Sequence, residues 1–215
     1  MGPKTLICDA DGTLLNSWEW MLAPAHRTLA KFGINYREED IETYFLGGIK
    51  LQSFYEHFAP KYVQRCLTMH RDIQKQEDVS KSIVPYPGVE RTLEVLYDHG
   101  VRLGIATSRS ERKPLLATLQ KFGINQCFGP IVCLQDVQNA KPDPESVLHA
   151  MELLGAGPKN TFFVGDTVAD MEAGKAAGVT TIAALYGFGD NEEIAQTEPN
   201  YSIDHFSEVI DIVLG

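Results

Sequence analysis

Short apolar runs that alternate with helix-forming segments constrain the fold of this chain more than any other feature. Each run is bounded by Gly, Pro, Asp or Ser, as buried strands usually are. The runs cover residues 5–8, 101–106, 130–134, 161–164 and 180–185. Segments 89–99, 113–122 and 145–154 between them have helical spacing of apolar residues, and each stops at a glycine. We therefore expect an α/β fold: a Rossmann-like, mostly parallel sheet with helices on both faces.

Residues 17–81 interrupt this rhythm, because they contain helical patterns and no convincing strand. The helical patterns cover residues 18–32, 38–45, 51–58 and 62–76, and a proline-containing linker follows them. We expect an α/β core made of residues 1–16 and 82–215, with a small all-α cap, residues 17–81, inserted directly after the first strand. Ligands of open α/β sheets bind at the C-terminal edge of the strands, so the cap is placed to cover a site there.

The charge balance and the cysteine usage limit the partners and the compartment. Lys plus Arg is 19 and Asp plus Glu is 29, so the 215-residue chain has a net charge of −10. A surface this acidic repels nucleic acid and anionic membranes, and an anionic substrate needs local positive charge. The chain has four cysteines without a CxxC pair, and no apolar run of membrane-spanning length. We expect a cytoplasmic protein with reduced thiols, whose partner is neither nucleic acid nor a membrane.

Aspartates at the ends of two apolar runs are the strongest indication of a functional site. Asp9 and Asp11 follow the first run and, in extended geometry, point to the same side. Asp166 ends a later run, and Asp170 shares a first helical turn with it if a helix starts there. A single aspartate of this kind fits a helix cap or a turn. Two pairs with no thiol or imidazole nearby favour a hard divalent cation, Mg²⁺ before Zn²⁺.

Two further segments supply groups that suit phosphate. Thr107 and Ser108 follow the run 101–106, where a hydroxyl and the amides of the next helix start can hold phosphate oxygens. Lys141 lies in a loop before a helix, and Pro142 restricts its backbone to an extended conformation. Taken singly, the Thr-Ser pair fits a plain N-cap and the lysine fits a solvated loop. Together with the carboxylates they predict an anion site with its own positive charge.

The order of these motifs resembles that of a known family. The elements are Asp9-Ala10-Asp11-Gly12-Thr13-Leu14, then Thr107, then Lys141-Pro142, then Gly165-Asp166-Thr167-Val168-Ala169-Asp170. In this order, with an insertion between the first and the second, they resemble the four motifs of the haloacid dehalogenase-like (HAD) hydrolase superfamily. The resemblance covers the whole chain and is closest to the phosphoglycolate phosphatase-like branch, which has a helical cap. Cys8 and Asn16 depart from the pattern, where a bulky apolar residue and Asp are common.

The resemblance implies a role for each aspartate. Asp9 would attack phosphorus and form an aspartyl phosphate, and Asp11 would act first as general acid and then as general base. Asp9, the backbone carbonyl of Asp11, and Asp166 would bind Mg²⁺, the implied cofactor. Asp170 would orient this ligand shell without binding the metal directly.

The function implied is that of a Mg²⁺-dependent phosphomonoesterase acting on a small phosphorylated metabolite. Thr107 and Lys141 would hold the phosphoryl oxygens, and phosphoglycolate, sugar phosphates and pyrophosphate remain open as substrates. The alternatives are a phosphomutase or phosphotransferase on the same fold, or a pyrophosphatase. Asp-Gly-Thr after the nucleophile fits the phosphatase branches better than the mutases. A non-enzymatic binding protein of this fold would be expected to lack at least one of the motif residues, and all are present.

The segment Gly47-Gly48-Ile49-Lys50 is a candidate for the loop of the cap that faces the substrate. Two adjacent glycines break a helical pattern and let the backbone approach a ligand closely. Lys50 then stands near the start of the next helix, where an anionic group of the substrate also meets free amides. An ordinary helix–helix turn with a solvated lysine explains the same pattern equally well.

Overall fold

The computed structural model describes residues 2–46, 51–76 and 81–215, and its contacts divide the chain into two compact units. The core unit consists of residues 1–16 and 85–215, and the helical unit of residues 17–84. The chain returns to the core unit at Pro85, and not at residue 82 as the sequence predicted. Strand β3 (Val84–Pro85) pairs there with β2 (Leu15–Asn16), so the return point coincides with this pairing.

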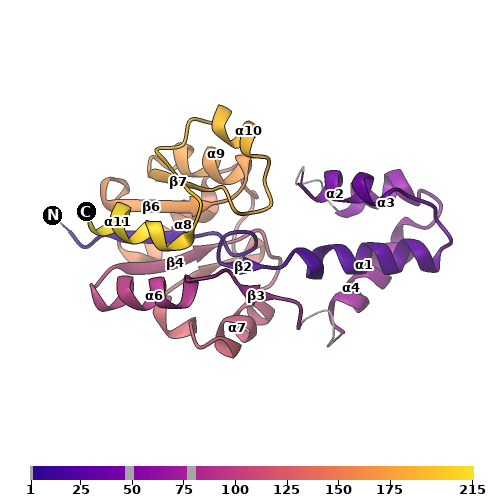
Figure 1. Cartoon of the computed structure of the whole chain (residues 1–215), viewed down its shortest axis with the longest axis horizontal. Coiled ribbons are helices and arrows are strands. Elements are labelled where there is room, and N and C mark those ends of the chain that lie inside the picture. Colours follow the sequence, from indigo (N-terminus) through magenta and orange to yellow (C-terminus); the bar gives the residue numbers. More distant parts are fainter. Residues whose placement is uncertain (1, 47–50, 77–80) are drawn as a thin grey trace. The chain divides into compact units, whose positions relative to one another are not determined.

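A six-stranded sheet forms the middle of the core unit, and all its neighbouring strands are parallel (Figure 1). In spatial order the strands are β5 (Ile131–Val132), β4 (Arg102–Ala106), β1 (Thr5–Cys8), β6 (Thr161–Gly165), β7 (Thr180–Ala184) and β8 (Tyr201–Ile203). Cys8 at the end of β1 lies opposite Ile105 of β4 and Val164 of β6. The residues that follow these three strands therefore meet at one edge of the sheet.

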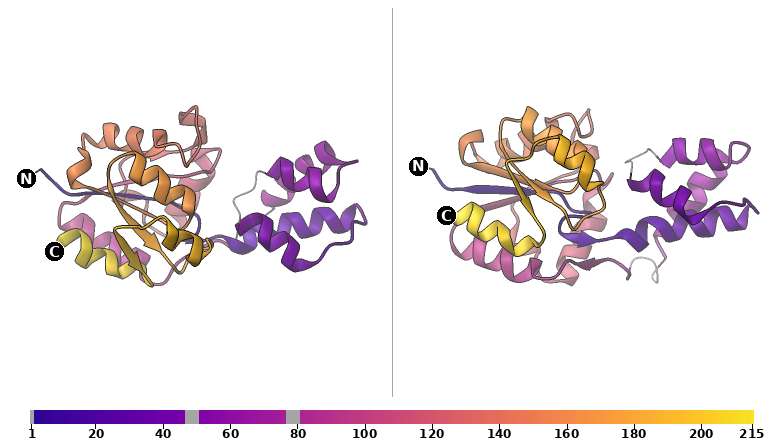
Figure 2. Two further views of the ribbon diagram at one scale, coloured as in Figure 1. Left: turned by 90° about the horizontal axis from the view of Figure 1, so that it is seen from above. Right: turned by 45° about the horizontal axis from the view of Figure 1, so that its top comes forward.

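Helices cover both faces of this sheet, which confirms the predicted α/β fold class. The helices of the core unit are α6 (Val89–Asp98), α7 (Arg112–Lys121), α8 (Glu145–Leu154), α9 (Val168–Ala176), α10 (Asn191–Gln196) and α11 (Val209–Leu214). Short 3-10 turns lie at Asn125–Cys127, Leu134–Asp136, Pro158–Asn160 and Phe206–Glu208. The orange helices α8 and α9 lie on one side of the strands, and α6 and the yellow α11 on the other (Figure 2).

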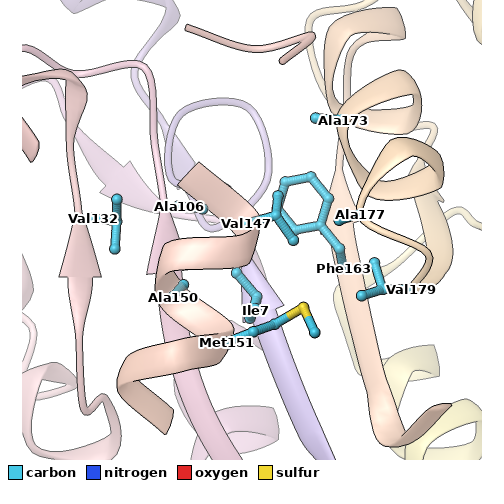
Figure 3. Packing of buried hydrophobic residues seen from close by; sticks show 10 residues of the cluster. All are labelled: Ile7, Ala106, Val132, Val147, Ala150, Met151, Phe163, Ala173, Ala177 and Val179. Atoms are coloured by element: carbon cyan, nitrogen blue, oxygen red, sulfur yellow. The ribbon is translucent and has the colours of Figure 1, made fainter. Parts of the chain in front are cut away.

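The apolar core beneath α8 and α9 fixes their position on the sheet. Figure 3 shows Met151 and Val147 of α8 over Ile7 of β1, with Phe163 of β6 beside them. All four strand residues of β1 are fully buried, as a strand covered on both faces requires. Burial of this apolar surface holds β1 in the centre of the sheet and its carboxyl end at a defined place.

Two strands differ from the sequence-based expectation. The run 130–134 gives only the two-residue strand β5, because the Asp136 carboxylate accepts the Cys133 N–H at 2.9 Å and turns the chain into a 3-10 helix. Strand β8 was not predicted from the sequence. Its residues Tyr201 and Ser202 are exposed at the sheet edge, so they form no apolar run.

The helical unit contains α1 (Trp18–Lys31), α2 (Glu38–Leu46), α3 (Leu51–Phe58) and α4 (Val63–Gln74). Its own apolar core lies between them, and its largest fully buried side chains are Phe54 and Tyr55 of α3. The candidate segment Gly47-Gly48-Ile49-Lys50 lies outside the described residues. Within the described parts of the chain, no helix combines the length and the apolarity needed to span a bilayer.

Candidate active site

Asp9 lies at the carboxyl end of the central strand and begins a tight loop. Its backbone N–H donates to the Val164 carbonyl at 2.8 Å, which continues the pairing of β1 with β6 for one more residue. Gly12 in the loop has φ +86°, a left-handed conformation that L side chains rarely adopt. A Cβ at Gly12 would stand 2.0 Å from an oxygen of Asp166, so both the turn and the close approach require glycine.

Lys141 joins two of the predicted carboxylates. Its ammonium donates to Asp9 Oδ1 at 2.6 Å, to Asp170 Oδ1 at 2.5 Å and to the Ala106 carbonyl at 3.3 Å. Only 5 % of the lysine side chain is exposed, so this is a buried ion pair and not a solvated loop lysine. Buried charge-assisted hydrogen bonds of this kind fix the geometry of both partners.

Asp166 is fully buried at the end of β6 and is held by neutral donors. The Thr13 hydroxyl donates to its Oδ1 at 2.8 Å, and the Phe188 N–H donates to its Oδ2 at 2.9 Å. A Cβ at Gly187 would stand 2.2 Å from the Cβ of Asp166, so the loop after β7 passes very close to this carboxylate. The sequence did not identify Thr13, Gly187 or Phe188 as its support.

Asp170 lies in the first turn of α9 and forms the N-terminal capping box of that helix with Thr167. The Thr167 hydroxyl donates to Asp170 Oδ2 at 2.6 Å, while the Asp170 N–H donates to the Thr167 hydroxyl oxygen at 3.2 Å. The expectation that Asp166 shares this turn is wrong, because Thr167 is the N-cap and Asp166 precedes it. The capping box leaves Oδ1 of Asp170 for Lys141.

Asp9, Asp166 and Asp170 form a carboxylate cluster, in which one oxygen from each lies within 4.8 Å of the others. Burial raises the pKa of Asp9 to about 7; Lys141 opposes this shift, and the charges of Asp170 and Asp11 add to it. Burial, Asp170 and Asp9 also raise the pKa of Asp166 well above its usual value. Buried like charges repel, and a bound divalent cation relieves that repulsion. These oxygens therefore fit a hard cation such as Mg²⁺.

The Asp11 side chain lies outside that cluster and pairs with Arg109. Arg109 Nε and Nη2 donate to the two oxygens of Asp11, both at 2.6 Å, so the ion pair is bidentate. The exposed fractions of the two side chains are 7 % for Arg109 and 17 % for Asp11. Burial tends to lower the pKa of Arg109, but Asp11 outweighs this effect and the pKa is raised. Arg109 lies two residues after Thr107 but was not predicted from the sequence as a site residue.

The two hydroxyl residues that follow β4, Thr107 and Ser108, have different environments. Thr107 is buried, and its hydroxyl oxygen accepts the Arg109 N–H at 3.2 Å, whereas Ser108 is exposed. Helix α7 begins only at Arg112 with Glu111 as its N-cap, so its first amides do not follow Thr107 directly. Contrary to the sequence-based expectation, Thr107 and Ser108 therefore do not directly precede the amides of a helix start.

Two tyrosines stand beside the carboxylates. The Tyr186 hydroxyl donates to the Thr13 carbonyl at 2.9 Å, and the ring of Tyr86 packs edge-on against Tyr186 with centroids 4.8 Å apart. Burial raises the pKa of Tyr86, and the charges of Asp166 and Asp11 raise it further. Tyr86 is thus an uncharged donor near both aspartates at neutral pH.

Comparison with known proteins gives one consistent set of similarities. The family model described as haloacid dehalogenase-like hydrolase matches residues 6–184. The pyrophosphatase PpaX of Halalkalibacterium halodurans is 32% identical over 212 residues, which are 98% of this chain and 96% of that protein. A haloacid dehalogenase-like family hydrolase from Streptococcus pneumoniae has a TM-score of 0.84 at 20% identity, covering 98% of both chains. A predicted phosphoglycolate phosphatase from Haemophilus somnus has a TM-score of 0.81 at 24% identity, covering 98% of this chain and 97% of that one.

Proposed function

Because the chain belongs to the family of haloacid dehalogenase-like hydrolases, we propose that it is a Mg²⁺-dependent phosphomonoesterase for a small phosphorylated metabolite. The observation that carries this proposal is the environment of Asp9. Its buried carboxylate is held by Lys141, belongs to the carboxylate cluster, and lies two residues before the Asp11–Arg109 pair. The groups that we assign as nucleophile, cation ligands and acid–base group all lie at one sheet edge of the core unit, which supports the proposal.

Asp9, Asp166 and the backbone carbonyl of Asp11 are the groups that we assign to Mg²⁺. The chemistry of the donors supports this assignment, since carboxylate and carbonyl oxygens are the ligands that Mg²⁺ prefers. Bound there, the ion supplies positive charge to the oxygens of a transferring phosphoryl group. Asp170 accepts hydrogen bonds from Thr167 and Lys141, which suits a role in orienting its neighbours better than direct binding.

The proposed reaction has two steps at phosphorus. In the first, a carboxylate oxygen of Asp9 bonds to phosphorus, the bond to the leaving oxygen breaks, and that oxygen takes a proton from Asp11. In the second, Asp11 takes a proton from water, whose oxygen bonds to phosphorus while the bond to Asp9 breaks. Phosphate and the original Asp9 carboxylate are the products. Lys141, with Thr107 and Ser108, is assigned to the phosphoryl oxygens.

Pyrophosphate is the second candidate substrate. The sequence likeness to pyrophosphatase PpaX, which extends over nearly the whole of both chains, favours it specifically. The same two steps apply, with phosphate in place of an alcohol as the leaving group. A phosphomutase would return the phosphoryl group to a sugar, and the Asp-Gly-Thr sequence after Asp9 favours water as acceptor.

The experiment that tests this function measures phosphate release by the purified protein. We expect release from p-nitrophenyl phosphate in Mg²⁺ and none in EDTA. A panel of phosphoglycolate, sugar phosphates and pyrophosphate then ranks substrates by kcat/KM. Phosphoryl transfer between sugars without net phosphate release would show that the protein is a phosphomutase and not a hydrolase. Absence of Mg²⁺-dependent release from every compound would overturn the proposal.

The compartment is proposed on the state of the thiols. Cys8, Cys66, Cys127 and Cys133 are all buried and unpaired as disulfides, which suits a reducing cytoplasm. The acidic net charge of −10 supports a small metabolite as partner in place of nucleic acid or an anionic membrane.

A further inference from the structure

We propose that Arg109 is a specificity-determining residue, which binds an anionic group on the leaving side of the substrate in exchange for Asp11. This inference rests on the proposed phosphatase function and names its substrate class. Preferred substrates are those whose leaving group carries its own oxyanion, such as pyrophosphate or a phosphorylated hydroxy acid. Esters of uncharged alcohols are the disfavoured class.

The position of Arg109 fixes its guanidinium beside the acid–base group. The residue lies in the loop after β4, where its backbone N–H is held by the Thr107 hydroxyl at 3.2 Å. Its side chain is 7 % exposed and donates two 2.6 Å hydrogen bonds to Asp11. The planar fork of a guanidinium matches the two oxygens of a carboxylate or a phosphate equally well.

The contact with Arg109 occupies both oxygens of Asp11. A leaving-group oxygen needs a hydrogen bond to one of those oxygens before a proton can pass between them. At least one N–H···O contact must therefore give way when the substrate is bound. The two hydrogen bonds from Arg109 therefore hold Asp11 in a conformation that the substrate has to disrupt.

The charge of Arg109 determines which substrates can displace Asp11 from it at a low cost in free energy. A buried guanidinium without an anionic partner is strongly destabilising. An oxyanion on the leaving group can replace Asp11 as that partner, so one bidentate pair is exchanged for another. An uncharged leaving group offers no replacement, and Arg109 then retains Asp11. Anionic leaving groups are thus favoured both by binding and by the release of Asp11.

A second arginine in the same loop region provides a matched control. Arg112 Nη2 donates to both oxygens of Asp136 at 2.8 Å, its Nε donates to the Ile131 carbonyl at 2.8 Å, and its side chain is 46 % exposed. Arg112→Gln therefore removes an arginine–aspartate ion pair three residues further along the chain, outside the site. Arg109→Gln is the test variant, and Arg109→Lys keeps the charge without the planar fork.

The assay compares substrates with and without an anionic group on the leaving side. 2-Phosphoglycolate and 2-hydroxyethyl phosphate form one matched pair, and pyrophosphate and p-nitrophenyl phosphate extend it. For Arg109→Gln we expect kcat/KM to fall about 10-fold or more on the two anionic substrates, chiefly through KM. On the two substrates with uncharged leaving groups we expect no loss and a rise in kcat/KM, because Arg109→Gln no longer retains Asp11. Arg109→Lys should fall between wild type and Arg109→Gln on the anionic substrates, and Arg112→Gln should match wild type on all four.

A binding measurement separates this inference from the proposed function. Calorimetry with pyrophosphate and excess Mg²⁺ on Asp9→Asn protein measures affinity without turnover. Adding Arg109→Gln should weaken that affinity about 10-fold or more, whereas adding Arg112→Gln should leave it unchanged. Equal losses of kcat/KM on substrates with anionic and with uncharged leaving groups would overturn the role of Arg109. An unchanged pyrophosphate affinity would overturn it as well. An inactive wild-type protein that still binds pyrophosphate through Arg109 would refute the phosphatase proposal alone.

Discussion

Asp9 and Asp11 stand two residues apart, and their side chains have different neighbours. The Asp9 carboxylate is buried against Lys141 and the rest of the carboxylate cluster, whereas the Asp11 carboxylate is paired with Arg109. Two identical functional groups of one short loop thus have separate environments.

Asp9→Asn should abolish turnover and leave the fold intact. The amide keeps the shape of the carboxylate but is a poor nucleophile and a weaker cation ligand. Activity is measured as phosphate release and folding by circular dichroism. A variant that keeps as much as about a tenth of the wild-type kcat, far above the loss expected for a missing nucleophile, contradicts the assignment.

Asp11→Asn should bind Mg²⁺ as wild type does, because the group assigned to the ion is the backbone carbonyl. Both half-reactions should slow by about 10²–10⁴, the usual contribution of a positioned acid–base group. Single-turnover kinetics and Mg²⁺ titration measure the two effects separately. Weak Mg²⁺ binding together with a normal rate at saturating metal would remove Asp11 from the acid–base role.

The metal-free protein should lose stability as the pH rises. Asp9 has a pKa of about 7 in the folded protein and near 4 when unfolded, so between these values the folded state binds more protons. The free energy of unfolding should fall over that window by at most about 1.4 kcal/mol per pH unit from this group. We expect Tm in EDTA to be lower at pH 8 than at pH 5, and excess Mg²⁺ to restore more of it at pH 8. Asp9→Asn should flatten the EDTA profile; a Tm in EDTA that rises toward pH 8 would contradict this account.

Single elements carry the site residues to the sheet edge, and α9 does so through its first turn. Thr167 and Asp170 close the helix with reciprocal hydrogen bonds, and Oδ1 of Asp170 then meets Lys141. Helix stability and the orientation of a cluster carboxylate depend on the same two side chains.

Thr167→Ala should therefore affect stability and activity together. Loss of the cap is expected to lower the free energy of unfolding by about 1 kcal/mol. Because Asp170 also loses a 2.6 Å hydrogen bond, the Mg²⁺ concentration for half-maximal activity should rise. Thr167→Ser retains the hydroxyl and is the control. A Thr167→Ala protein with lower Tm but unchanged Mg²⁺ dependence would separate the two roles.

The strands that were predicted well from the sequence are those that other elements cover on both faces of the sheet. Buried strands such as β1 and β6 form continuous apolar runs, and glycines mark the ends of α6 and α8. Strand β8 has one buried residue, Ile203, so periodicity could not reveal it. Side-chain partners were equally hidden, because Arg109 and Asp11 are 98 positions apart and no local pattern joins them.

At the scale of the whole molecule, the two units have separate apolar cores. Met151 and Phe163 belong to the core unit, and Phe54 and Tyr55 to the helical unit. Because their cores are separate, each unit can unfold and refold with its own free energy of unfolding.

Phe54→Ala should raise hydrogen exchange within residues 17–84 and leave the strands of the core unit protected. Phe54 is 1 % exposed, and truncating a buried Phe typically costs about 3–5 kcal/mol. Phe163→Ala, at a fully buried position of β6, is the matched variant and should have the reverse pattern. Hydrogen exchange followed by mass spectrometry resolves the two units. Loss of protection throughout the chain in Phe54→Ala would mean that they unfold as one.

All described side chains of the carboxylate cluster, together with Lys141, Asp11 and Arg109, come from the core unit. Substitutions within residues 17–84 therefore change none of these side chains. After gene duplication, the described residues of the inserted segment can accumulate substitutions without altering any side chain that we assign to the reaction. Descendants of one ancestral gene can therefore diversify in that segment while they all retain the same hydrolytic chemistry.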